Sequence, residues 1–326
     1  QAICAWGKSR MTTLHVDSDL HDDRRRAMLY EGDICVSGPR PSTIALIEHA
    51  RGMIEEAYGD DPCRAQFRMS VEAFSAIGAA LKPRFIHHPR TRTLIQRVVA
   101  DHGCDLRDIH LDVPRLRLAT SSGYLTTGVG YAFHPHRDTW YSAPMCQINW
   151  WLPIYDFDRD AGMAFHPRYM REAVKNGSAD FNYYRWNADG RKNAAKHVGS
   201  DTRVQPKPLQ EIELDPQIRP VCKAGGIIMF SAAHLHSTVP NTSGLTRFSI
   251  DFRTVSQTDL EDRRGAVNLD SHCTGTSLRD FVRGTDRQPL PDGLIAGYDS
   301  GGPVEGGVLV FKPEQHDDRA ARPVDA

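Results

Sequence analysis

The chain has 326 residues, 40% of them hydrophobic, so it is long enough to bury a sizeable core in one or two domains. Its 40 Lys and Arg residues balance its 41 Asp and Glu residues, which argues against nucleic acid as a partner because a polyanion-binding surface needs a basic excess. The longest apolar run, residues 225–230, is far too short to cross a bilayer, so we predict no membrane partner.

The cysteines and the N-terminus indicate where the chain works. Seven cysteines occur at wide spacing, and none forms a Cys-x-x-Cys pair. This pattern argues against a disulfide framework and against a cysteine-based zinc site. Residues 1–6 lack the charged-then-apolar pattern of a signal peptide. We therefore predict a cytoplasmic location.

The first third of the chain is predicted to be helical. Residues 22–26, Asp-Asp-Arg-Arg-Arg, are interpreted as a solvated helix start or loop. From Pro41 to Gly59 apolar residues recur at helical spacing, and further helices are predicted over 70–81 and 91–100. We expect residues 1–105 to support a larger structure from the outside.

From Leu111 the apolar period shifts to two, which is typical of strands. Short strands separated by turns, with flanking helices, favour a mainly β fold of jelly-roll type. Because alternating strand–helix units and a Gly-x-Gly-x-x-Gly motif are absent, the pattern argues against a Rossmann fold. The predicted strands are 111–118 (broken at Pro114), 123–133, 144–154, 161–165, 226–230, 235–239 and 246–255.

These elements divide a single predicted domain, residues 1–326, into parts. The jelly-roll core is expected in 106–167 and 225–256. Residues 168–224 between them are polar and lack a sustained period; this insertion is either a lid over an active site or a surface loop. Residues 257–326 form a Gly- and Pro-rich extension, with a helical turn expected at 278–282 and a strand at 307–311.

A histidine-rich segment, residues 134–138, provides the first candidate site. On a strand, residues i and i+2 point to the same face, so His136 and Asp138 project together and Arg137 turns to the outer face. An imidazole and a carboxylate supply two adjacent metal ligands. A third ligand from a distant strand completes a facial triad with open positions, and His236 is the candidate.

Two neighbouring histidines remain alternatives. His134 lies on the same predicted face as His136 and is interpreted as a residue of the pocket wall or a support for the ligands. His234 stands two residues before His236 and is the alternative third ligand.

A candidate anion site follows the second histidine segment. On a strand, Arg247 and Ser249 share one face, whereas Phe248, Ile250 and Phe252 share the other and are expected in the core. A guanidinium beside a hydroxyl suits a carboxylate, and burying an arginine without an anion would be costly.

Three stretches together resemble the non-haem Fe(II)/2-oxoglutarate dioxygenases, and are most similar to their phytanoyl-CoA dioxygenase-like branch. The similarity covers roughly residues 128–255 and leaves the N-terminal third and the tail unmatched. The stretches are His136-Arg137-Asp138, residues 150–163 and residues 236–247.

The resemblance implies a double-stranded β-helix that holds Fe(II) through His136, Asp138 and His236, the spacing to Arg247 favouring His236 over His234. It implies 2-oxoglutarate and O2 as co-substrates, with the far carboxylate of 2-oxoglutarate on Arg247 and Ser249. The implied reaction oxidises an unactivated C–H bond, hydroxylation being the default, and releases succinate and CO2. A carboxylate at Asp138 argues against the halogenases of the superfamily.

Further residues are candidates for the pocket. Trp151 falls where the branch places an aromatic residue near the co-substrate, and Gln147 shares its strand face as a weaker candidate. Candidate substrate contacts are His134, Trp140, Asn149 and Arg253. Several Arg and Tyr side chains favour a small polar substrate, such as a metabolite, an amino acid or a natural-product intermediate.

Two other functions stay open. His134-x-His136-x-Asp138 also begins the motif of metallo-β-lactamase-like hydrolases, which use two metals. Thr139 stands where the last histidine of that motif belongs, and a strand is predicted to follow. A non-catalytic jelly-roll binding protein is the other alternative, and it leaves Arg247 and Ser249 unexplained.

Overall fold

The computed structural model describes residues 11–126, 134–190 and 205–312. Most of the strand predicted over 123–133 lies outside these residues. Among the described residues, no helix has the length and apolar character needed to span a membrane.

An eight-stranded sheet forms the centre of the fold. Its strands run in the order β1-β2-β7-β5-β9-β3-β10, and β4 also pairs with β9. The β1–β2 pair is parallel and the other pairs are antiparallel. The strands are β1 (Leu14–Val16), β2 (Ile34–Ser37), β3 (Ile109–Leu111), β4 (Arg115–Ala119), β5 (Ile148–Pro153), β7 (Ile227–Ser231), β9 (Arg247–Ser256) and β10 (Val282–Arg283).

A second, two-stranded sheet pairs β6 (Met163–Phe165) with β8 (His236–Thr238). An isolated bridge between His136 and His236 adds one more residue to its edge. The described chain is thus a large, mostly antiparallel sheet and a small sheet with flanking helices. This arrangement is consistent with the predicted jelly roll.

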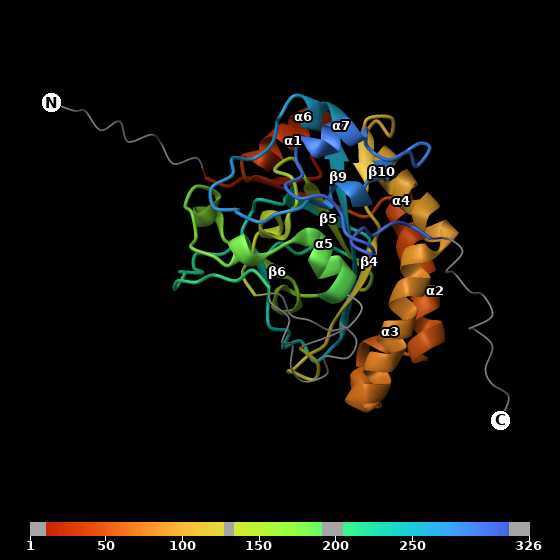
Figure 1. Ribbon diagram of the computed structural model, residues 1–326. Helices are drawn as coiled ribbons and strands as arrows, with labels where there is room; N and C mark the ends of the chain where they lie inside the picture. The colour runs from red at the N-terminus through yellow and green to blue at the C-terminus, as the bar shows by residue number, and fades with distance from the viewer. Residues whose placement is uncertain (1–10, 127–133, 191–204, 313–326) are drawn as a thin grey trace.

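Three N-terminal helices, α2 (Pro41–Tyr58), α3 (Val71–His87) and α4 (Pro89–Asp101), lie together on one side of the molecule (Figure 1). The helix predicted from Pro41 is confirmed, and it ends at Gly59, whose φ of 76° suits glycine. Helix α3 continues well past its predicted end at 81. Leu81 and Phe85 lie about one turn apart and are both buried. Their packing stabilises the helix beyond Pro83, which would otherwise favour its end.

Helix α1 (Asp22–Tyr30) confirms a helix start at residues 22–26, where Asp23 and Arg24 are exposed, but not all of the segment is solvated. Arg25 and Arg26 are buried and both pair with Asp22 in the first turn. Arg26 also donates to Asp259 of the C-terminal part over 2.7 Å. These ion pairs therefore connect two distant segments of the chain, because a buried charge must be paired.

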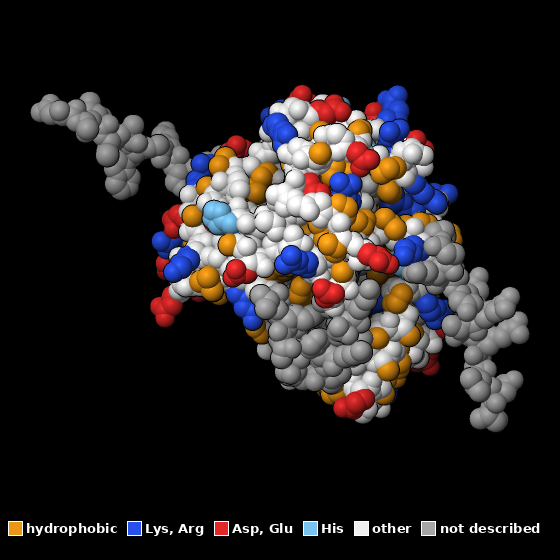
Figure 2. All heavy atoms as spheres, viewed as in Figure 1, with side chains coloured by type: hydrophobic (Ala, Val, Ile, Leu, Met, Phe, Trp, Pro, Cys, Tyr) orange, Lys and Arg blue, Asp and Glu red, His pale blue; other side chains and the backbone are white. Residues whose placement is uncertain are grey.

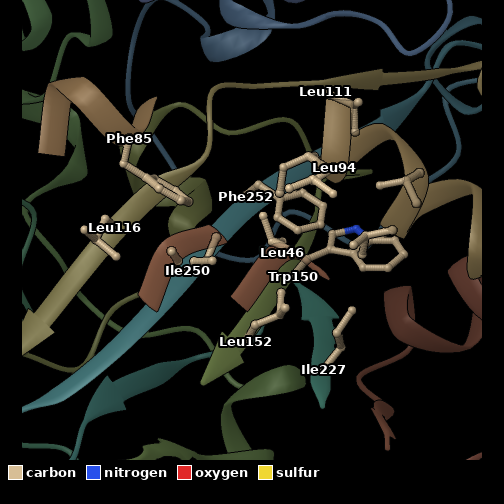
Figure 3. Packing of buried hydrophobic residues seen from close by; sticks show 14 of the residues in the cluster. Leu46, Phe85, Leu94, Leu111, Leu116, Trp150, Leu152, Ile227, Ile250 and Phe252 are labelled. Atoms are coloured by element: carbon tan, nitrogen blue, oxygen red, sulfur yellow. The ribbon is translucent and has the colours of Figure 1, made fainter. Parts of the chain in front are cut away.

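The main core lies between these helices and the large sheet, where side chains of β4, β5, β7 and β9 meet those of α2, α3 and α4 (Figure 3). Phe248, Ile250 and Phe252 are fully buried, which confirms the prediction that this face of β9 is core. Trp150 of β5 stacks on Phe252 with ring centroids 5.4 Å apart. The strands are therefore apolar on the helix side and free to carry polar side chains on the other.

Truncating this core should be costly. We expect Phe252→Ala to lower the free energy of unfolding by about 3–5 kcal/mol, because it removes a fully buried ring and leaves a cavity. Urea unfolding followed by circular dichroism measures the change. Phe67→Ala is the control, since that ring is 61% exposed and its loss should cost within about 0.5 kcal/mol. Equal losses in the two variants would contradict the assignment.

The C-terminal extension is only partly as predicted. A 3-10 turn at Ser277–Asp280 agrees with the helical turn expected there, and two short helices, α6 (Gln257–Glu261) and α7 (Asp292–Ala296), were not predicted. The strand predicted over 307–311 is wrong. Its backbone is irregular, and the N–H of Leu309 donates to the Asp280 carboxylate instead of a strand partner.

Charged groups are mixed on the surface. Figure 2 shows Lys and Arg side chains interspersed with Asp and Glu side chains on the face in view.

Candidate metal centre

Three predicted ligands come together in space. One potential ligand atom from each of His136, Asp138 and His236 lies within 4.8 Å of the others. The two histidines are held by a reciprocal pair of backbone hydrogen bonds, each 2.9 Å long, and their ring centroids are 4.4 Å apart. The predicted grouping is confirmed.

The local backbone differs from the prediction. His136 pairs with His236, but the chain then leaves the sheet, and Asp138 begins a 3-10 helix over Asp138–Tyr141. The expected strand through His136 and Asp138, continuing beyond them, is therefore wrong. Polar residues at positions i and i+2, such as His136 and Asp138, are as compatible with a bridge followed by a turn as with a strand.

Both imidazoles present the same nitrogen to the centre. Nδ1 of His136 lies 2.8 Å from the carbonyl oxygen of His134, and Nδ1 of His236 lies 2.9 Å from that of His234. Because a carbonyl only accepts, each Nδ1 carries the proton in the neutral ring and Nε2 keeps its lone pair. Burial, together with the neighbouring His136, lowers the pKa of His236 to about 3, so it stays neutral.

The carboxylate of Asp138 is held ionised and in place. Burial by itself would raise its pKa, but the contact with His136 and the positive charge of Arg253 outweigh burial and hold the pKa well below its usual range. Asn149 donates to Asp138 over 2.9 Å, and Gln147 lies 3.5 Å from the same oxygen. Gln147 also donates to the Asn149 side-chain oxygen over 2.9 Å, so the two amides act as a pair.

Loss of the nearer amide should loosen the metal site. We expect Asn149→Ala to weaken Fe(II) or Co(II) binding about 10- to 100-fold, because partners that orient a ligating carboxylate typically contribute that much. Competition with a metal-sensitive chelator measures the affinity. Asn268→Ala is the control, since the described hydrogen-bond partners of its amide are backbone groups of Ser271 and not a metal ligand. Unchanged metal affinity in Asn149→Ala would show that Asp138 needs no such support.

Arg247 is a buried cation beside the centre. Its side chain donates to Ser249 over 2.9 Å, and its guanidinium carbon lies 5.2 Å from the centre of the Trp151 ring. Burial lowers its pKa to about 10, opposed by Asp251, and its Nε has no hydrogen-bond partner among the described residues. A buried guanidinium with an unused donor is suited to a carboxylate ligand.

Two adjoining cavities open onto the metal ligands His136 and Asp138. The first has a volume of about 130 Å³ and is also lined by His236, Trp151 and Arg247. The second, of about 300 Å³, lies beside Gln147 and the insertion. Residues lining both cavities are Lys82, Arg117, His136, Asp138 and Arg253.

Two other predicted positions are placed differently. Trp140 is fully buried, donates to Asp270 over 2.8 Å and lines neither cavity, so its assignment as a substrate contact is wrong. Arg137 points away from the ligands, as predicted, but it is buried against Asp270 and three backbone carbonyls instead of lying on the outer face. Asp270 accepts hydrogen bonds from both side chains and thereby sets their directions, because a buried carboxylate needs hydrogen-bond donors.

The two alternative histidines are not among the grouped ligands. His134 lies with Nε2 2.6 Å from the Pro206 carbonyl oxygen, and burial lowers its pKa to about 4. His234 is fully buried against Phe165, with ring centroids 5.2 Å apart. Among the described residues, the one group of three or more metal-binding side chains is His136, Asp138 and His236.

Several charged residues of the site were missed. Arg117 and Arg115 come from β4, and Asp251 from β9 beside them. The alternation Arg-Leu-Arg-Leu over 115–118 is the signal, since it puts two arginines on the face opposite the core. Lys82 reaches the cavities from α3, and no local pattern in the sequence marks it.

Comparison with known proteins finds similar solved structures but no match by sequence. No family model and no curated protein matches the chain. Among solved structures, the non-heme monooxygenase ThoJ in its apo form is 17% identical, covers 91% of each chain and has a TM-score of 0.43. The non-heme alpha ketoglutarate dependent epimerase SnoN from nogalamycin biosynthesis is 14% identical, with 72% of this chain and 80% of that chain covered and a TM-score of 0.36. AviO1 from Streptomyces viridochromogenes Tue57 is 12% identical, with 73% and 97% covered and a TM-score of 0.36. At these TM-scores the assignment of function rests on the geometry of the site.

Proposed function

We propose that the protein is an Fe(II)- and 2-oxoglutarate-dependent oxygenase that oxidises a C–H bond of a small molecule, hydroxylation being the default outcome. The proposal places the site in a double-stranded β-helix core within a single domain. The observation that carries it is the combination in one cavity of a His-Asp-His group with the buried Arg247, whose Nε has no hydrogen-bond partner among the described residues.

The donor set fits Fe(II). Two neutral imidazole nitrogens and one ionised carboxylate are the ligands of non-haem Fe(II) oxygenases, which leave further coordination positions open. His136 Nε2 lies 3.4 Å from Asp138 Oδ1. With its proton on Nδ1, that contact sets a lone pair against a carboxylate, and a cation between the two groups relieves the repulsion. His136, Asp138 and His236 are therefore the proposed ligands.

The first cavity fits 2-oxoglutarate. Arg247 and Ser249 would hold the carboxylate far from the metal, while the opposite end of the molecule reaches the three ligands. Trp151 packs against the guanidinium and limits its movement. A small volume of about 130 Å³ suits a five-carbon dicarboxylate better than a large substrate.

When bound, Fe(II) with 2-oxoglutarate and O2 supplies an oxidant able to break an unactivated C–H bond, with release of succinate and CO2. The residues of this chain contribute orientation and exclusion of water. Asn149 and Gln147 fix the Asp138 carboxylate, and Arg253 balances its charge at 3.8 Å. Buried apolar side chains behind β9 keep this framework rigid.

The hydrolase alternative is not favoured. A two-metal site needs His134, but that side chain is directed to the Pro206 carbonyl and is not part of the described metal-binding group. A non-catalytic binding protein would leave the buried charge of Arg247 unexplained.

Uncoupled turnover distinguishes these functions. Purified protein with Fe(II), 2-oxoglutarate and O2 should form succinate, measured by chromatography, and should form none without O2 or with Zn(II) in place of Fe(II). Hydrolysis of esters or lactams that depends on Zn(II) and not on O2 would contradict the oxygenase and support the hydrolase.

A further inference from the structure

The second cavity has two unlike surfaces. One is aromatic and comes from the 3-10 helix at the metal centre and from the insertion, with Tyr141, Phe181 and Trp186 as its main members. The other is basic and comes from α3, β4 and β9, with Lys82, Arg117 and Arg253. A cavity of this composition can hold a molecule that has an apolar end and a negatively charged end.

The aromatic surface, defined as Tyr141, Phe181 and Trp186, is continuous with the metal centre. The Tyr141 ring meets His136 edge to face at 5.6 Å and Phe181 at 5.2 Å. Phe181 in turn lies 5.8 Å from Trp186. Flat rings packed in this way offer a large contact area to another planar ring, worth about 0.5–1.5 kcal/mol per aromatic pair beyond simple burial.

This surface is fastened in place by the C-terminal extension. Asn182 donates to Thr274 and Asn187 donates to the Gly307 carbonyl, each over 3.0 Å, and the Tyr183 hydroxyl donates to Asp280. Helix α5 (Tyr183–Arg185) is seen next to β4 in Figure 1, and residues of both elements line the second cavity. The wall is therefore preformed, which reduces the ordering cost of binding.

Among the described residues, the basic surface and its acidic partners carry more positive than negative charge once Asp138 is committed to a metal. Arg115 pairs with Asp112, and Arg117 pairs with Asp251. Arg253 shares both of those acids, at 3.5 and 3.1 Å. Lys82 is a fourth basic group, against three acids when Asp280 is counted, whose carboxylate accepts hydrogen bonds from Tyr183 and Leu309.

Lys82 lines the second cavity from α3, together with Arg117 of β4. Burial, with the nearby charge of Arg117, lowers its pKa to about 7. An anion bound beside it would favour its charged form and gain a charge-assisted hydrogen bond.

We propose that the second cavity is the substrate chamber and that its substrate carries a planar ring system and one carboxylate. The ring packs on Tyr141, Phe181 and Trp186, and the carboxylate meets Lys82 beside Arg117. This inference rests on the proposed function, because the opening to His136 and Asp138 makes the occupant a substrate.

Three small probes separate the two parts of this proposal. Calorimetric titration of the full chain uses 2-naphthoate, which has ring and charge, 2-naphthamide, which has the ring alone, and hexanoate, which has the charge alone. Anaerobic Fe(II) and saturating 2-oxoglutarate keep the first cavity filled. We expect 2-naphthoate to bind at least about 10-fold more tightly than either other probe, the equivalent of one charge-assisted contact.

Variants assign the contacts. Lys82→Met should weaken 2-naphthoate about 10-fold and leave 2-naphthamide unchanged, and Lys82→Arg should restore the loss. Phe181→Ala should weaken both naphthalene probes. The matched control is Arg84→Met, which removes a positive charge from the same helix, where Arg84 faces Glu56 of α2.

Each outcome decides the matter. Equal affinity for acid and amide, or an equal loss in Arg84→Met, would overturn the charged contact. Hexanoate binding as tightly as 2-naphthoate, or no binding of any probe, would overturn the chamber. Repeating the titrations on metal-free protein separates the two levels. If the protein prefers 2-naphthoate but forms no Fe(II)–2-oxoglutarate complex, the proposed function alone is overturned. If it forms that complex but does not prefer 2-naphthoate, the chamber alone is overturned.

Discussion

Asp138→Ala is expected to lower Fe(II)-dependent succinate formation by at least about 100-fold. Asp138 is the only carboxylate in the described metal-binding group, and even partners that merely orient a ligand contribute 10- to 100-fold. Removing it leaves two neutral imidazoles, which hold a divalent cation poorly. Metal content after dialysis and the rate of succinate release from 2-oxoglutarate measure the effect.

The control for this variant is Asp156→Ala, which removes a carboxylate at the surface beside Lys223 and should leave the rate unchanged. Thermal unfolding of both variants shows whether the fold survives. Full succinate formation by folded Asp138→Ala would rule out Asp138 as a ligand.

Arg247→Met should weaken 2-oxoglutarate about 100-fold while leaving Fe(II) affinity within a few-fold of the original. Truncating one partner of a buried, hydrogen-bonded charge pair typically costs 2–5 kcal/mol. Methionine fills much of the same volume and removes a cation that is costly to bury without its anion. The dissociation constants of metal and co-substrate, measured separately under anaerobic conditions, test this split.

Arg247→Lys should recover part of the affinity, because it keeps the charge and loses the two-pronged geometry. Arg219→Met, at a partly exposed arginine that pairs with Asp160, should change neither constant. If 2-oxoglutarate affinity is unchanged in Arg247→Met, the anchor lies elsewhere, and Arg253 is the next candidate.

Much of this site follows from residue alternation in the sequence. Phe248, Ile250 and Phe252 report one face of β9 as core, so Arg247 and Ser249 had to lie together on the other. The same logic predicted that His136 and Asp138 lie close together, although the backbone between them turns instead of extending. Where a periodic pattern extends over a long strand, the sequence determines which side chains face the core.

Other parts depend on tertiary contacts that no local pattern encodes. Trp140 and Arg137 are directed by Asp270, an acid more than 100 residues away that requires buried donors. Lys82 reaches the cavities from α3. The apolar spacing of that helix predicts which side packs on the core, but it does not predict a role for Lys82. The strand expected over 307–311 fails for a similar reason, since Asp280 takes the N–H of Leu309.

Anaerobic titration with Fe(II) and 2-oxoglutarate tests the central claim most directly. Binding of 2-oxoglutarate to Fe(II) held by His136, Asp138 and His236 should produce a weak visible metal-to-ligand charge-transfer band that saturates at one equivalent. The band should be lost in Asp138→Ala and should require far more 2-oxoglutarate in Arg247→Met. A folded protein that shows no band at any concentration would contradict the account.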